Sequence, residues 1–114
     1  FEGSDKILRD FIYIEDVIQA NIKAATPKKS GVYNVGTGKA RSFQDIADIL
    51  QKELGTNLGT NYIPNPYIGQ YQFHTEANIE DTKTYLDYEP KYEMEDGIKD
   101  YISEIKRIYE MEVK

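Results

Sequence analysis

The sequence contains no cysteine, no tryptophan and only one histidine among its 114 residues. Without cysteine the chain forms no disulfide and performs no thiolate chemistry, and one histidine is too few for an ordinary structural zinc site. No apolar run approaches the roughly 18 to 20 residues that cross a bilayer, and no secretory signal stands at the start. We therefore expect a soluble, cytoplasmic protein with no metal site and no membrane partner.

Positive charge is also scarce, because 14 Lys and Arg face 20 Asp and Glu, which gives a net charge of −6. A chain of this sign lacks the electrostatic footprint that binds nucleic acid or anionic lipid. The length allows one modest domain. Hydrophobic residues make up 39% of the chain, which is few for a domain that must bury its own core.

Two segments have the composition of buried strands, and a helical pattern lies between them. Residues 10–14 and 32–35 are aromatic and β-branched runs. Glu15 and Asp16 place negative charge where a helix would begin, and apolar residues then recur at helical spacing as far as Pro27. This order predicts a βαβ crossover with two parallel strands.

Three further helices follow from caps and periodicity. Ser42 and Asp45 are spaced as an N-cap and an acidic N3 residue, and Gly55 fits the C′ position. Residues 81–86 predict a short helix, and residues 94–111 an amphipathic one. The helix after Ser42 has an apolar stripe made of Phe43, Ile46, Ala47, Ile49, Leu50 and Leu54.

The predicted fold class is therefore α/β, with two parallel strands of an incomplete sheet plus helices. Parallel strands lie inside larger sheets that helices cover on both faces, and two strands cannot make such a sheet. We interpret residues 1–114 as the C-terminal part of a larger α/β enzyme whose missing strands precede Phe1. Such a part should leave apolar surface uncovered beside its strands.

No complete catalytic set is present in the sequence. Gly36 and Gly38 follow a predicted strand, but the third glycine of a dinucleotide loop is absent, so we expect them only to shape a tight connection. His74 has no neighbouring motif that supports nucleophilic catalysis. We predict no catalytic, cofactor-binding or metal-binding residue in this chain.

Arg9 and Tyr71 are the candidate ligand-binding residues. Arg9 precedes a strand, and strand ends border the ligand crevice of open α/β sheets. Its guanidinium can hold a diphosphate through two parallel hydrogen bonds. Tyr71 lies in a polar loop, where its flat face and hydroxyl suit sugars and phosphates. A solvated surface arginine and ordinary loop packing of the tyrosine remain open alternatives.

Several segments resemble a known family. Residues 9–17 (RDFIYIEDV) resemble the R-D-F-[IV]-Y-[IV]-x-D-V segment of extended short-chain dehydrogenases/reductases. Residues 33–38 (YNVGTG), followed by the S-F-x-x-I-A run at 42–47, resemble a second family segment. Both are typical of nucleotide-sugar epimerases, dehydratases and reductases. Residues 1–4 (FEGS) and 69–75 are similar to the ADP-L-glycero-D-manno-heptose 6-epimerase family.

This resemblance implies an NADP-dependent enzyme that inverts C6 of an ADP-heptose for lipopolysaccharide core synthesis, by removing a hydride and returning it to the opposite face. It implies an extended Rossmann-type fold whose cofactor loop and catalytic Tyr and Lys lie upstream, so that this chain is the substrate-binding portion and is inactive by itself. A homopentamer is also implied. The substrate-binding residues that the resemblance gives are Phe1, Glu2, Gly3, Ser4, Arg9 and Tyr71.

Two other functions stay open. A nucleotide-sugar 4-epimerase or 4,6-dehydratase would share the two general segments, and a non-catalytic binding domain would share none of the chemistry. Residues 64–70 diverge from the heptose epimerase pattern, so no sugar contact is carried over to them.

Overall fold

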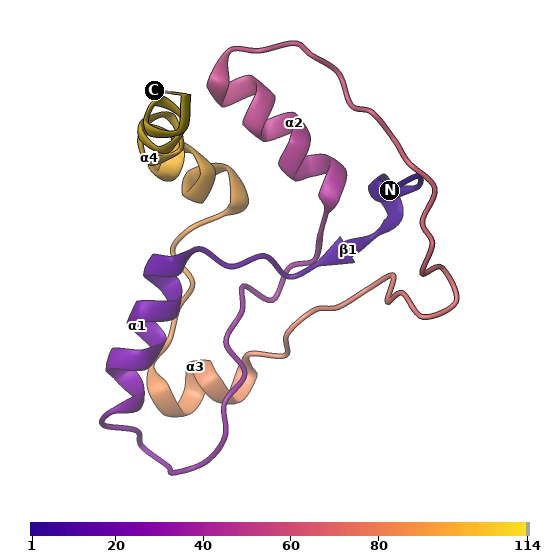
Figure 1. Ribbon diagram of the computed structural model, residues 1–114. Helices are drawn as coiled ribbons and strands as arrows, with labels where there is room; N and C mark the ends of the chain where they lie inside the picture. The colour runs from indigo at the N-terminus through magenta and orange to yellow at the C-terminus, as the bar shows by residue number, and fades with distance from the viewer. Residues whose placement is uncertain (114) are drawn as a thin grey trace.

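Four helices provide most of the regular structure in the computed structural model, which describes residues 1–113. The remaining elements are a 3-10 helix, η1 (Ser4–Lys6), and two short strands, β1 (Leu8–Arg9) and β2 (Arg41–Ser42). In Figure 1, α2 and α4 lie together at one end of the molecule, α1 and α3 lie at the other, and the segment that joins β1 to α1 runs between them. The helices are α1 (Ile14–Ala24), α2 (Phe43–Leu54), α3 (Glu80–Leu86) and α4 (Met94–Val113).

The helices confirm the predictions that rest on local signals. At the start of α2, Ser42 Oγ accepts the Asp45 N–H at 3.0 Å, and the Asp45 carboxylate accepts the Ser42 N–H at 3.1 Å. This capping box satisfies two backbone donors that a helix start would otherwise leave free. The helix ends at Gly55, whose φ of 70° is the left-handed conformation that glycine adopts without steric cost.

The predicted pair of parallel strands is wrong in this structure. Residues 10–13 and 32–35 form no strand, and α1 already begins at Ile14. The observed ladder is antiparallel and joins β1 to β2, with Arg9 opposite Arg41. On the other edge of β1, Leu8 forms an isolated parallel bridge with His74.

Side chains bind part of the backbone in and directly after the second predicted strand. The Asp10 carboxylate accepts the N–H groups of Thr37 and Gly38, both at 2.9 Å. The carbonyl of Asn34 accepts the Thr82 hydroxyl at 2.6 Å, and that of Gly36 accepts the Tyr88 hydroxyl at 2.6 Å. No segment of residues 1–113 pairs with residues 10–13 or 32–35. The strand prediction fails here because a strand forms only where another segment supplies its ladder.

The buried core is small and lies between α1 and α3. It consists of Ala20, Ile79, Leu86 and Tyr88, with Tyr33 and Ala77 packed against it. Asp16 on α1 is only 1% exposed. Its carboxylate accepts the backbone N–H groups of Lys91 and Tyr92. The segment that leads into α4 is thereby held against α1.

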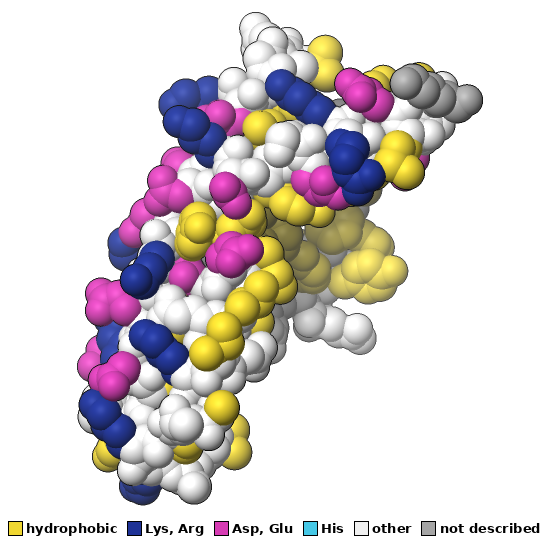
Figure 2. Space-filling view, turned by 90° about the vertical axis from the view of Figure 1, so that its left-hand side faces the viewer, with side chains coloured by type: hydrophobic (Ala, Val, Ile, Leu, Met, Phe, Trp, Pro, Cys, Tyr) yellow, Lys and Arg dark blue, Asp and Glu magenta, His cyan; other side chains and the backbone are white. Residues whose placement is uncertain are grey.

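Much apolar surface stays uncovered. The radius of gyration is 16.8 Å, whereas a compact domain of 100 residues has about 13 Å. On α1, Ile14, Ile18 and Ile22 follow one another at helical spacing and are 54%, 42% and 68% exposed. Figure 2 shows hydrophobic side chains gathered along a hollowed inner edge, while charged side chains alternate along the opposite edge. Uncovered apolar surface is therefore present, as the sequence predicts.

Candidate ligand-binding site

Arg9 lies at the centre of an aromatic cluster at the end of β1. The central carbon of its guanidinium is 5.3 Å from the ring centroid of Tyr71 and 5.9 Å from that of Phe43. Both distances are within the range in which a cation is attracted to the face of an aromatic ring. One guanidinium nitrogen, Nη1, donates a 2.8 Å hydrogen bond to the Leu8 carbonyl.

Arg9 differs from the other two arginines in its electrostatic environment. Arg41 pairs with Glu95 and Asp45, and Arg107 pairs with Glu104. Within residues 1–113, Arg9 makes no ion pair, although the chain carries 20 carboxylate side chains. A positive charge held between aromatic rings and not neutralised is suited to an anionic ligand.

The predicted N-terminal residues lie around this cluster but differ in their roles. Phe1 joins it directly, because its ring packs edge-to-face on Tyr71 with centroids 5.8 Å apart. Glu2 is exposed, and its N–H donates to the Ile63 carbonyl at 2.8 Å. Gly3, with a φ of 76°, turns the chain into η1. The structure therefore brings Phe1, Arg9 and Tyr71 together.

The Ser4 side chain is hydrogen-bonded to α2, so its role in this arrangement is structural. Its side chain is buried, and Oγ donates a 3.3 Å hydrogen bond to Gln44 Oε1 on α2. The same Gln44 oxygen accepts the hydroxyl of Tyr62. Ser4 thus anchors the N-terminal turn, and its hydroxyl is already occupied.

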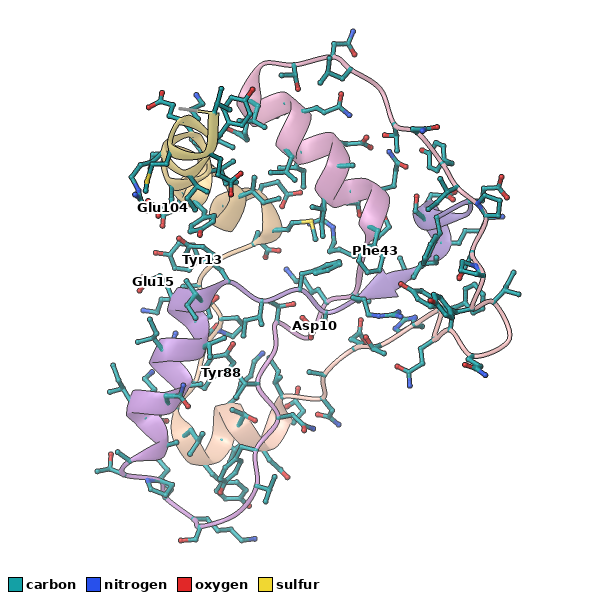
Figure 3. All side chains as sticks on the ribbon, in the orientation of Figure 1. Asp10, Tyr13, Glu15, Phe43, Tyr88 and Glu104 are labelled. Atoms are coloured by element: carbon teal, nitrogen blue, oxygen red, sulfur yellow. The ribbon has the colours of Figure 1, made fainter. Side chains whose placement is uncertain are left out.

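Sequence reasoning missed Phe43 as a neighbour of Arg9 and Gln44 as the anchor of Ser4. Phe43 belongs to the predicted apolar stripe of α2, and no further role for it follows from the sequence. In the structure it is 37% exposed and packs edge-to-face on Phe11, with centroids 5.3 Å apart. Figure 3 labels Phe43 beside the β1 region, near Asp10. No pattern in the sequence separates this residue from the rest of the stripe.

The glycine turn at 36–38 does not fit a dinucleotide. The N–H groups of Thr37 and Gly38, which would have to face a pyrophosphate, both donate to Asp10. A Cβ at Gly36 would lie 2.6 Å from Asp10 Oδ2 and 2.7 Å from the Ala77 side chain. The turn is therefore a point of close packing, and we derive no cofactor contact from it.

A separate apolar pocket of about 180 Å³ lies between residues 11–13, α2 and α4. At its edge the Tyr13 hydroxyl donates a 2.5 Å hydrogen bond to Asp100, and this bond, together with partial burial and nearby negative charges, raises the pKa of Tyr13 to about 12. The tyrosine therefore stays protonated at neutral pH. Over residues 1–113, no group of acidic and histidine side chains is placed to hold a metal ion, and no helix there is long and apolar enough to cross a membrane.

Comparisons with known proteins first define the class. A solved UDP-glucuronic acid 4-epimerase from Bacillus cereus, in complex with NAD, matches with a TM-score of 0.77 and 31% identity. The match covers 95% of this chain and 33% of the other. The fold is thus that of a part of the extended Rossmann-type nucleotide-sugar epimerases, which confirms the predicted fold class.

The heptose-specific resemblance is confirmed as well. The crystal structure of ADP-L-glycero-D-manno-heptose-6-epimerase from Helicobacter pylori is 52% identical, with a TM-score of 0.79 over 90% of this chain and 31% of that chain. The enzyme of the same name from Brachyspira hyodysenteriae is 37% identical over 110 residues, which are 94% of this chain and 34% of that protein. The chain therefore spans about a third of the length of these relatives. No protein-family model matches it.

Proposed function

We propose that this chain is the substrate-binding portion of a longer ADP-L-glycero-D-manno-heptose 6-epimerase. The complete enzyme would interconvert ADP-D-glycero- and ADP-L-glycero-D-manno-heptose, with NADP taking a hydride from C6 and returning it. The N-terminal Rossmann domain, with the cofactor and the catalytic Tyr and Lys, lies outside this chain, which is inactive by itself. A cytoplasmic homo-oligomer that serves lipopolysaccharide core synthesis belongs to the same proposal. The identity of 52% to the Helicobacter pylori enzyme supports it.

The observation that carries the proposal is the environment of the Arg9 guanidinium. This group lies over Tyr71 and Phe43 and has no carboxylate partner within residues 1–113. In our proposal it binds the ADP diphosphate through paired hydrogen bonds, which a planar guanidinium makes and a lysine does not. The Tyr71 hydroxyl donates to the substrate, and residues 1–4 line the nucleotide site.

The contribution of these residues to the reaction is binding and orientation. A diphosphate held by Arg9 limits where the attached sugar can lie, and fixing the reacting carbon in place removes an entropic part of the barrier. The chemical step itself uses groups that this chain does not contain.

The uncovered apolar surface supports the second part of the proposal, that the chain acts within a longer protein. The isoleucines of α1 are 42% to 68% exposed, and Val32 is fully exposed. Exposure of such a stripe to water is unfavourable, because burying each apolar side chain lowers the free energy of the protein. We propose that the Rossmann domain covers it.

The test is a substitution at Arg9 in the full-length protein. Arg9→Lys should weaken ADP binding, measured by calorimetry, by about 1.5 to 3 kcal/mol, since a point charge replaces a bidentate fork. The matched control is Arg107→Lys, because Arg107 is paired with Glu104 on α4. Unchanged ADP affinity, KM and kcat in the Arg9 variant would show that Arg9 is a solvated surface charge and does not bind the diphosphate.

A nucleotide-sugar 4-epimerase is the second candidate, and the identity of 31% to the UDP-glucuronic acid 4-epimerase favours it. The two candidates differ in the base that the site accepts. Titration of the full-length protein with ADP, UDP and dTDP separates them, and a preference for a pyrimidine nucleotide would exclude the heptose assignment.

A further inference from the structure

Phe43 contacts the candidate ligand-binding arginine without being one of the residues assigned to the ligand. We propose that Phe43 is a positioning residue that directs the Arg9 guanidinium toward a diphosphate and thereby raises the affinity for ADP without contacting it. This inference rests on the proposed function and deepens it. It assigns a role to a residue that the sequence places only in the apolar stripe of α2.

Phe43 is itself held firmly in place. It is the first residue of α2, directly after the Ser42 capping box. Its backbone N–H donates to the Ile7 carbonyl at 3.3 Å, and its ring packs against Phe11. Because β1 and β2 pair with Arg9 opposite Arg41, the start of α2 is fixed relative to Arg9. The ring therefore lies at a defined place before any ligand arrives.

Arg9, by contrast, has few fixed contacts. The only hydrogen bond of its side chain within residues 1–113 joins Nη1 to the Leu8 carbonyl. A long side chain with one such bond samples many rotamers, and ordering it on binding costs affinity. The Phe43 ring, 5.9 Å from the guanidinium carbon, attracts the cation and limits its orientations before binding. The N–H groups that remain lie in the plane of the guanidinium, as in any arginine, and a diphosphate could accept them.

The second ring over Arg9 does not make Phe43 redundant. Tyr71 belongs to the long irregular segment before α3, and its neighbour in the cluster is Phe1 near the start of the chain. Phe43 is anchored instead by a capped helix and by Phe11. Phe43 is thus the support that comes from regular structure.

The experiment measures the binding of ADP and adenosine to the full-length protein by calorimetry, with Phe43→Leu and Phe43→Tyr. We expect Phe43→Leu to weaken ADP binding about 3- to 10-fold, the range that corresponds to losing one cation–π contact, and to leave adenosine binding unchanged. Phe43→Tyr keeps the ring and should restore ADP affinity to within about twofold. The matched control is Leu58→Ala, at an apolar side chain that is 87% exposed and far from Arg9 in the sequence.

A double-mutant cycle separates positioning from general damage to the fold. In the Arg9→Lys background, Phe43→Leu should cause no further loss of ADP affinity, because the guanidinium that Phe43 positions is already absent. Equal losses for ADP and adenosine, losses that add in the double variant, or wild-type affinity in Phe43→Leu would each overturn the inference. If Phe43→Leu does not fold, Phe43→Met keeps the bulk against Phe11 without an aromatic face and gives the same test.

The same titrations distinguish failure of the inference from failure of the proposed function. If ADP binds tightly and Arg9→Lys weakens it, but the cycle shows no coupling, only the role of Phe43 is wrong. If the protein prefers UDP, the heptose assignment is wrong, and the cycle is measured with UDP. If no nucleoside diphosphate binds, both are overturned.

Discussion

Thr37 Oγ1 donates a hydrogen bond of 2.5 Å to Asp10 Oδ1, across 27 positions of the chain. The same carboxylate accepts the backbone N–H groups of Thr37 and Gly38 at 2.9 Å and of Ala77 at 3.1 Å. Asp10 therefore joins three segments: the one that follows β1, the glycine turn, and the one that leads into α3.

Asp10→Asn should destabilise the 114-residue chain by about 2 to 3 kcal/mol. The amide has one acceptor oxygen in place of two, and its NH₂ group would face the N–H groups of Gly38 and Ala77, which leaves partly buried donors unpaired. Urea unfolding followed by circular dichroism measures the loss. The control is Asp5→Asn on the exposed surface of η1. A midpoint equal to that of the wild type would show that Asp10 does not join these segments.

Gly36→Ala should cost about 1 to 3 kcal/mol, because a Cβ at this position would lie 2.6 Å from Asp10 Oδ2 and the packing would have to shift. Gly31→Ala is the matched control, since its Cβ would meet only the Tyr33 ring at 3.6 Å. Thermal unfolding of the two variants side by side checks the difference. Similar melting temperatures in both would contradict the close approach.

Tyr88→Phe should lower stability at neutral pH and flatten its decline in alkali. The hydroxyl donates to the Gly36 carbonyl, so its loss leaves a buried acceptor unpaired and costs about 1 to 2 kcal/mol. Burial, followed by the charges of Asp16 and Asp10, raises the pKa of Tyr88 to about 12, from 10.0 in the unfolded chain. The stabilisation is therefore complete below pH 10 and is lost as the pH rises toward about 12.

Urea midpoints between neutral pH and pH 12 test this prediction. The wild type should lose stability more steeply than Tyr88→Phe above pH 10, the unperturbed value. Tyr67→Phe, at a tyrosine that is 59% exposed, should behave like the wild type. Parallel alkaline declines in the wild type and the Tyr88 variant would refute the assignment.

Glu95→Gln should reduce the acid sensitivity of the chain. Both Glu95 oxygens accept from Arg41, at 2.6 and 3.1 Å. These hydrogen bonds hold the pKa of Glu95 at about 2, below its ordinary 4.5. The stabilisation is present above pH 4.5 and is lost as the pH falls toward 2.

Because the Glu95 side chain is 53% exposed, solvent screening limits this contribution to about 1 kcal/mol. Urea midpoints at about pH 6, above the transition, and at about pH 2.5, near its lower end, should differ less in Glu95→Gln than in the wild type. Glu112→Gln, near the exposed end of α4, serves as the control. An unchanged acid response in the Glu95 variant would be inconsistent with a bridge between β2 and α4.

The helices were predictable because their signals are local. Ser42, Asp45 and Gly55 specify the ends of α2 within a few residues of sequence. The strands were not, since a strand exists only when another segment pairs with it. Residues 10–13 and 32–35 have strand composition, but no segment of residues 1–113 pairs with them, and the neighbouring groups of Thr37 and Gly36 bond to the side chains of Asp10 and Tyr88. No local sequence pattern indicates which groups form hydrogen bonds with these segments.

Residue types for the candidate ligand-binding site could be chosen from the sequence, but the way these residues come together could not. Arg9 and Tyr71 could be chosen because a guanidinium and a tyrosine in a polar loop suit phosphates and sugars. That Phe1 packs on Tyr71 and Phe43 lies under Arg9 depends on contacts between distant parts of the chain. The apolar spacing of α2 is the same whether Phe43 faces a core or a guanidinium.

Where carboxylate side chains hold the backbone in place, the chain tolerates substitution of those carboxylates less than substitution of other residues. Main-chain ladder bonds survive almost any replacement except proline, because the backbone supplies both partners. Here Asp10 and Asp16 hold backbone groups of remote segments with their side chains. A single substitution at Asp10 or Asp16 can therefore free the segment that its carboxylate holds. Asp10 is also the immediate neighbour of Arg9 in the sequence. If Arg9 binds a diphosphate as we propose, substitutions at Asp10 should therefore impair that binding without removing any group that contacts the ligand.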